Sequence, residues 1–142
     1  MIKNLAISLF FLLGSATLSA QVNLLPIFSD NMVLQQQTQA PVWGKSKPNK
    51  KVEITTSWDQ KKHTIQADAQ GNWKTKVDTP VAGGPYTITI SDGKPVKLNN
   101  VMIGEVWVCS GQSNMEMQVE GWGKVMNYQQ EKEEANNYPN IR

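Results

Sequence analysis

Residues 21–100 alternate between apolar and polar positions, the pattern of strands with one buried face. In 52–58 the even-numbered residues Val52, Ile54 and Trp58 share one face, and polar residues share the other. The same alternation occurs in 62–67, 73–77 and 86–90. Turn-forming residues separate these segments, among them Asp59-Gln60, Gln70-Gly71-Asn72, Gly83-Gly84-Pro85 and Asp92-Gly93. Several short strands at this spacing predict an antiparallel β-sandwich of the immunoglobulin or jelly-roll kind over 21–100.

The pattern changes at residue 101. Residues 101–109 are nearly all apolar and do not alternate, which indicates a strand buried on both faces, as in a parallel sheet covered by helices. A helix is predicted from Asn127 to Asn137, with Asn127 as N-cap and Gln130 three residues later. Residues 101–142 thus predict one strand, a turn and a helix. Because one such unit cannot bury a parallel sheet, we expect the sequence to be an N-terminal fragment whose second, α/β domain is truncated.

The first 20 residues have the pattern of a secretory signal peptide. Lys3 precedes an apolar run from Leu5 to Leu13, and small residues lead to Ala20. The alternative is a membrane anchor, but this run is much shorter than the roughly 20 residues needed to cross a bilayer. We therefore expect export to the periplasm or the extracellular space, with no membrane span after cleavage.

Composition narrows the function classes. The net charge is +2 with no basic block, which argues against a nucleic-acid partner. The single cysteine, Cys109, excludes an internal disulfide, and its apolar neighbours predict a buried, unreactive thiol. No His, Cys or carboxylate cluster has metal-ligand spacing, so no metal and no cofactor are expected.

Ser113 is the candidate nucleophile. It follows Gly111 at the carboxyl end of the predicted strand, where open α/β sheets place ligand sites. Met115 stands where the Gly-x-Ser-x-Gly elbow needs its second glycine, which argues against the ordinary α/β-hydrolase fold. A serine nucleophile also needs a base. The single histidine, His63, lies on the apolar side of a predicted strand, which favours a structural role.

The segment from Trp107 to Met117 resembles the nucleophile block of sialate O-acetylesterases, relatives of the SGNH hydrolases. Two upstream segments, Phe28 to Gln35 and Pro41 to Gly44, resemble the β domain that precedes the catalytic domain in bacterial members. The resemblance implies a three-layer, flavodoxin-like catalytic domain and a carbohydrate O-acetylesterase. It makes Ser113 the nucleophile and its backbone N–H one oxyanion donor. The family's catalytic histidine, the acid before it and the further oxyanion Gly and Asn have no matching positions here, so the isolated chain is expected to be inactive.

Residues near Ser113 are candidates for substrate binding. Gln112 and Asn114 flank it, and either contact the substrate or brace the turn. Trp122, between two glycines, is a candidate for lining a pocket. Three other tryptophans (Trp43, Trp58 and Trp73) offer a sugar-stacking face, although the alternation favours the core for Trp58 and Trp73. Trp107 belongs to the predicted buried strand.

The substrate and the class of protein stay open at this point. The resemblance suggests acetylated sialic acid, and an acetylated plant-type polysaccharide is the alternative substrate. A non-catalytic, glycan-binding β-sandwich with 101–142 as a remnant is the alternative class. The sequence does not define an oligomeric state.

Overall fold

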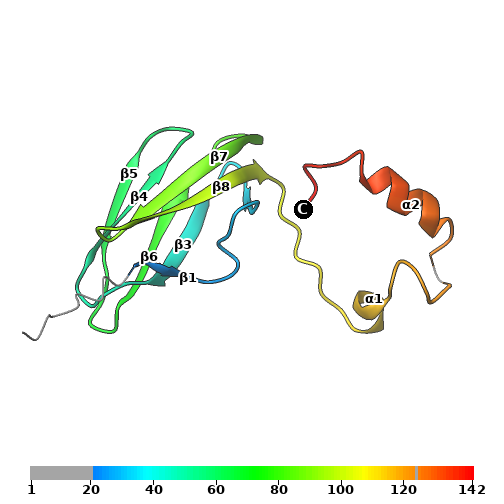
Figure 1. Cartoon of the computed structure of the whole chain (residues 1–142), viewed down its shortest axis with the longest axis horizontal. Coiled ribbons are helices and arrows are strands. Elements are labelled where there is room, and N and C mark those ends of the chain that lie inside the picture. The colour runs from blue at the N-terminus through cyan, green and yellow to red at the C-terminus, as the bar shows by residue number, and fades with distance from the viewer. Residues whose placement is uncertain (1–20, 124) are drawn as a thin grey trace, which may run out of the picture.

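The computed structural model describes residues 21–123 and 125–142. The predicted signal peptide, residues 1–20, lies outside the described residues. A β-sheet region comes first, and a tail with two helices follows it (Figure 1). Within the described part of the chain, no helix is both long and apolar enough to cross a membrane.

The strands form two sheets. The first sheet has three strands in the order β1-β3-β6, and its neighbours are antiparallel. The second has five in the order β2-β8-β7-β4-β5. In the second sheet β2 runs parallel to β8, whereas the sequence predicted only antiparallel strands there. The strands are β1 (Asn23–Leu24), β2 (Val33–Gln35), β3 (Gln39–Lys45), β4 (Lys51–Thr56), β5 (Lys62–Gln66), β6 (Asn72–Asp78), β7 (Gly83–Ser91) and β8 (Pro95–Gly104).

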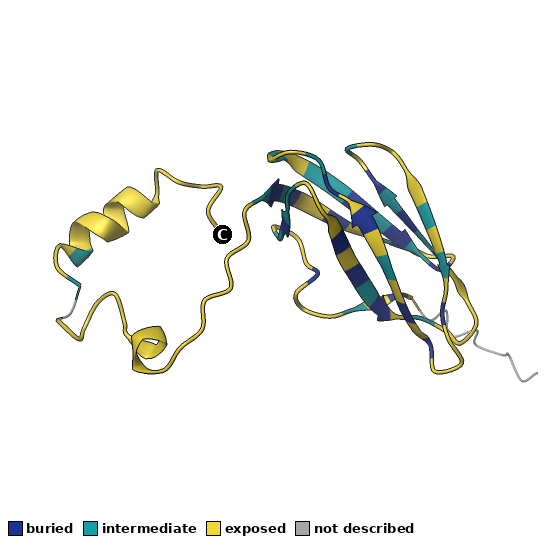
Figure 2. Ribbon diagram, turned by 180° about the vertical axis from the view of Figure 1, so that it is seen from behind, coloured by how far each residue is buried: buried dark blue, intermediate teal, exposed yellow. Residues whose placement is uncertain are grey.

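The two sheets share one hydrophobic core. Val42 and Val77 enter it from the first sheet, and Ile54, Ile88 and Ile90 enter it from the second. Buried and less buried residues alternate along the strands, as Figure 2 shows, because successive side chains of a strand point to opposite faces. The structure thus confirms the prediction of a mostly β protein region with two sheets. Its likeness to an immunoglobulin or jelly-roll sandwich stays a prediction.

A close contact between β3 and β6 depends on Gly44. Gly44 lies opposite Trp73 in the antiparallel pair. A Cβ atom at position 44 would lie 2.8 Å from the Trp73 ring atom Cζ2 and 2.7 Å from the Asn23 carbonyl oxygen. Only glycine therefore leaves room for the Trp73 indole, which is 3% exposed, to pack this closely against β3.

The predicted buried strand over 101–109 is wrong beyond Gly104. Val101 and Ile103 are buried because β8 pairs with β7 on one side and β2 on the other. Past Gly104 no described strand lies alongside the chain, so Trp107 is 83% exposed and Cys109 is exposed. The predictions of a buried Trp107 and a buried Cys109 are therefore also wrong. β8 itself crosses the predicted domain boundary at residue 100.

The tail carries α1 (Ser113–Glu116) and α2 (Tyr128–Ala135), and neither helix has a buried residue (Figure 2). The helix predicted over 127–137 is confirmed, with shorter bounds. Its predicted capping box does not form, because Asn127 makes no cap hydrogen bond and the Gln130 amide donates to Glu134 Oε1 at 2.8 Å. At the end of the tail, the Arg142 guanidinium donates to the Asn100 carbonyl oxygen at 2.6 Å.

Candidate active site around Ser113

Ser113 is the first residue of α1 and is exposed to solvent. The turn that contains it is closed by a hydrogen bond from the Met115 backbone N–H to the Gln112 carbonyl oxygen, at 2.9 Å. A side chain at Gly111 would lie 3.3 Å from Met115 Cγ, so glycine gives this turn room. The structure therefore places the Ser113 hydroxyl on a short, solvent-facing turn, where an acyl group has access to it.

The segment that leads from β8 to Ser113 is held at its start by two glutamines. The side-chain amides of Gln35 and Gln36 donate to the Glu105 carboxylate at 3.0 Å and 2.6 Å, and the Val106 N–H donates to Gln35 Oε1 at 2.9 Å. The Gln35 amide, with a further contribution from Gln36, holds the pKa of Glu105 below its ordinary value. Sequence reasoning missed this contact, because the partners are about 70 residues apart and no motif joins them.

The three predicted substrate-binding residues stay near Ser113 in sequence but are not joined to it by described contacts. Gln112 and Asn114 are exposed, and their side chains form no hydrogen bond within the described chain. Trp122 is 48% exposed. A shallow hollow beside α2 includes Glu120, Tyr128 and Lys132 but neither Ser113 nor Trp122. Substrate binding by Gln112, Asn114 and Trp122 therefore stays a prediction.

His63 does not serve Ser113 as a base in this structure. It lies in β5, opposite Ile54 of β4, and is partly buried. Its Nε2 atom is buried and has no hydrogen-bond partner among the described residues. α1 lies well away from β5 (Figure 1). The structural role expected for His63 fits this position.

The three tryptophans of the β region do not form one sugar-stacking face. Trp73 belongs to the core, as predicted, and alternation along the paired strands puts Trp43 on the opposite face of the sheet. Trp58 packs edge-to-face on Tyr86, with ring centroids 5.6 Å apart, and its indole N–H donates to the Asp78 carbonyl oxygen at 2.9 Å. Trp43 is partly buried and packs edge-to-face on Phe28.

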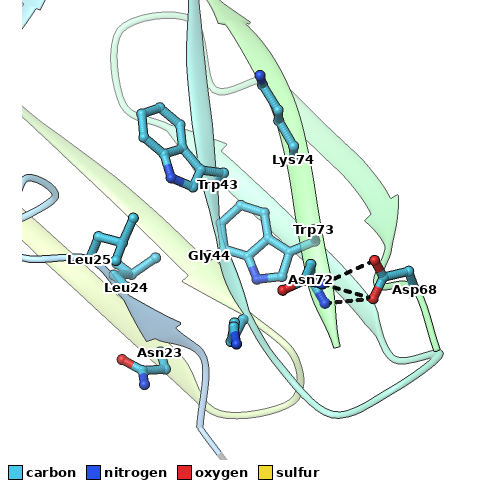
Figure 3. Close-up of a pocket in the computed structure, with 10 residues that line it drawn as sticks. Asn23, Leu24, Leu25, Trp43, Gly44, Asp68, Asn72, Trp73 and Lys74 are labelled. Carbon is cyan, nitrogen blue, oxygen red and sulfur yellow. Dashed lines mark hydrogen bonds between the residues drawn. The ribbon is translucent and has the colours of Figure 1, made fainter. Parts of the chain in front are cut away.

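A hollow of about 660 Å³ lies beside Trp43, at the end of the first sheet (Figure 3). Residues of β1, β3 and β6 line it, together with Asp68 and Leu25. The Asp68 carboxylate accepts a hydrogen bond from the Asn72 backbone N–H at 2.8 Å (Figure 3). That bond is the main reason why the pKa of Asp68 lies below its ordinary value. No group of three or more metal-ligating side chains occurs within residues 21–123 and 125–142.

Comparison with known proteins adds the following similarities. No protein-family model matches the chain. The mouse sialate O-acetylesterase is 30% identical over 126 residues, which cover 81% of this chain and 23% of that protein. The human sialate O-acetylesterase is 32% identical over 101 residues, covering 64% and 19%. The crystal structure of a carbohydrate acetylesterase from Xanthomonas citri matches 69% of this chain and 22% of that one, with a TM-score of 0.64 and 37% identity.

In sequence and fold, the chain is related to esterases that act on acetylated carbohydrates. Within that class, the sequence of the chain is similar to those of sialate O-acetylesterases. The chain spans about a quarter or less of the length of the proteins it matches.

Proposed function

We propose that the chain carries the nucleophile of a carbohydrate O-acetylesterase, and that this nucleophile is Ser113. The similarity to the mouse enzyme is the observation that carries the proposal. That match leaves out about 19% of the chain. Because this is fewer residues than the 30 from Ser113 to Arg142, the matched part of the chain includes Ser113. The exposed position of Ser113 on a Gly-x-Ser turn supports the role.

The proposed reaction is acyl transfer through the Ser113 hydroxyl. Its oxygen attacks the acetyl carbonyl carbon while a base takes the proton, and the sugar hydroxyl leaves as the acetyl-enzyme forms. Water then attacks the acetyl-enzyme, and acetate is released. The Ser113 backbone N–H stabilises the negative oxygen of each tetrahedral intermediate, and one such donor contributes roughly 10²- to 10³-fold in rate.

The base in this proposal comes from outside the 142 residues. The chain has one histidine, His63, and it lies in the core sheet without a contact to Ser113. A histidine, an orienting acid and further oxyanion donors would be supplied by an α/β domain of the SGNH-hydrolase type. Exposed apolar side chains of the tail support this arrangement, because large apolar surfaces of this kind normally pack against protein. They include Val106, Trp107, Val108, Met115, Met126 and Ile141.

The proposed substrate is an acetylated sugar, with O-acetylated sialic acid first and acetylated plant-type polysaccharide second. The curated relatives support the first, and the Xanthomonas citri enzyme supports the wider class of acetylated carbohydrates. We also propose that the protein acts after export, in the periplasm or outside the cell.

The test compares Ser113→Ala with Ser110→Ala in the complete gene product. Both serines are exposed and lie three residues apart on the same segment, so Ser110→Ala controls for the loss of a hydroxyl. Acetate release is measured from O-acetylated N-acetylneuraminic acid and from acetylated xylan. We expect Ser113→Ala to lose at least about 10³-fold in rate and Ser110→Ala to keep most of it. Equal activity of the two variants would show that Ser113 is not the nucleophile.

A further inference from the structure

We infer that the face of the first sheet bearing Trp43 binds an acidic saccharide, through a cluster made of Trp43, Lys45, Asn72 and Lys74. This inference goes beyond the proposed esterase function and does not involve Ser113. It assigns a ligand class to a surface of the β region whose lining does not include Ser113.

The register of β3 and β6 brings the four residues together. Trp43 lies opposite Lys74, and Lys45 lies opposite Asn72. Residues directly opposite each other in an antiparallel pair have Cβ atoms roughly 5 Å apart and point to the same face. Trp43 and Lys45 are two positions apart, so they also share that face. An indole, two lysine side chains and an amide therefore extend from the same face of the sheet.

The cluster borders the hollow of about 660 Å³ described above, and all four residues are among those that line it. This size is typical of small-molecule sites, which combine an apolar wall with a few polar groups (Figure 3). Asn23, opposite Lys45 on β1, adds a second amide to the lining. The Asn23 amide can donate to sugar hydroxyls and accept from them, whereas the Asn72 amide, whose nitrogen donates to Asp68, has its oxygen left to accept.

The indole of Trp43 is fixed in place before any ligand binds. Its ring centroid lies 4.7 Å from that of Phe28, and the two planes are 85° apart. Trp43 is only partly buried, so this support leaves part of the ring available. A rigid indole can pack on the apolar face of a pyranose ring at little cost in conformational entropy.

The charge of the lining favours an acidic ligand. Lys45 and Lys74 are exposed, and neither takes part in an ion pair within the described part of the chain. The carboxylate of the lining, on Asp68, already accepts hydrogen bonds from the backbone N–H groups of Gln70 and Asn72 and from the Asn72 side-chain amide. A lysine opposite a tryptophan also stabilises a sheet without any ligand. That role does not account for Lys45 or for the hollow, whereas a sugar carboxylate held by both lysines accounts for them together.

The test measures binding of sugars that carry no acetyl ester, so that the result does not depend on hydrolysis. The 142-residue chain is titrated with sialyllactose and glucuronic acid, and with their neutral counterparts lactose and glucose. We expect each acidic sugar to bind at least about fivefold more tightly than its neutral counterpart, and the difference to shrink at high salt. Trp43→Ala should weaken binding by about tenfold, and Lys45→Gln and Lys74→Gln by about two- to fivefold each.

Lys97→Gln is the matched control, because Lys97 is an exposed strand lysine of the other sheet, and it should leave affinity unchanged. Trp43→Phe keeps an aromatic ring against Phe28, so it replaces Trp43→Ala if the latter does not fold. The inference is overturned if acidic and neutral sugars bind equally, or if the two lysine variants bind like the Lys97 variant. It is also overturned if none of the four sugars binds at millimolar concentration. A failure of the Ser113 test would leave these measurements unaffected.

Discussion

Substitution of Gly44 by alanine tests how the two sheets close at the Trp73 end. The added methyl group would lie 2.7 Å from the Asn23 carbonyl oxygen, 2.8 Å from Trp73 Cζ2 and 3.2 Å from Leu24 Cδ2. The first two distances are well inside van der Waals contact, and the carbonyl belongs to the backbone of β1. Either β1 separates from β3, or the Trp73 indole leaves its place against β3. Forcing a methyl group into a packed site of this kind costs about 1 to 3 kcal/mol.

The assay is urea unfolding of Gly44→Ala, followed by tryptophan fluorescence and by circular dichroism. Gly104→Ala is the matched control, since Gly104 is also a strand glycine but its added Cβ would meet only Val33 Cγ1, at 4.0 Å. We expect Gly44→Ala to lose about 2 kcal/mol of unfolding free energy and Gly104→Ala to stay within about 0.5 kcal/mol of the parent. If the two variants were equally stable, the close packing of Trp73 on Gly44 would be refuted.

Two further predictions concern the segment that leads to Ser113. The pKa of Glu105 lies below its ordinary value because the Gln35 and Gln36 amides donate to the carboxylate. The ionised Glu105 carboxylate therefore stabilises the folded state fully above pH 4.5, and this stabilisation is lost as the pH falls through the lowered pKa. Gln35→Ala should therefore raise the Glu105 midpoint in a carbon-detected NMR titration, and an unchanged midpoint would contradict the contact. Cys109 is exposed, so Ellman's reagent should modify it in the native 142-residue chain as fast as in the urea-unfolded chain. Strong protection of the native thiol would show that the segment is buried.

The strands of the β region could be predicted well because their burial follows the alternation of the sequence. β4 is a clear case, since Val52, Ile54 and Thr56 are fully buried while Glu53 and Thr55 between them are not. The order of the strands could not be predicted. β2 pairs with β8, about 70 residues further along, and neither segment carries a signal for a parallel partner.

The apolar run from 101 to 109 shows where hydrophobicity alone misleads. Val101 and Val108 are the same residue type in the same run, yet the first is fully buried and the second is 91% exposed. The difference is the presence of paired strands beside Val101, which depends on the rest of the fold. Ser113 could be proposed from its motif, whereas the cluster around Trp43 could not, because it needs the register between β3 and β6.

The path of β8 sets the shortest piece of this chain that should fold as a stable β unit. A recombinant product that stopped at residue 100 would retain Pro95 to Asn100 but would lose Met102, Ile103 and Gly104, which are the pairing partners of β2. Val33 to Gln35 would then have no neighbouring strand, and two side chains of the core, Val101 and Ile103, would be missing. Expression that extends through Val106 would keep both the pairing and the glutamine contacts to Glu105, so sugar binding could be measured without the helical tail.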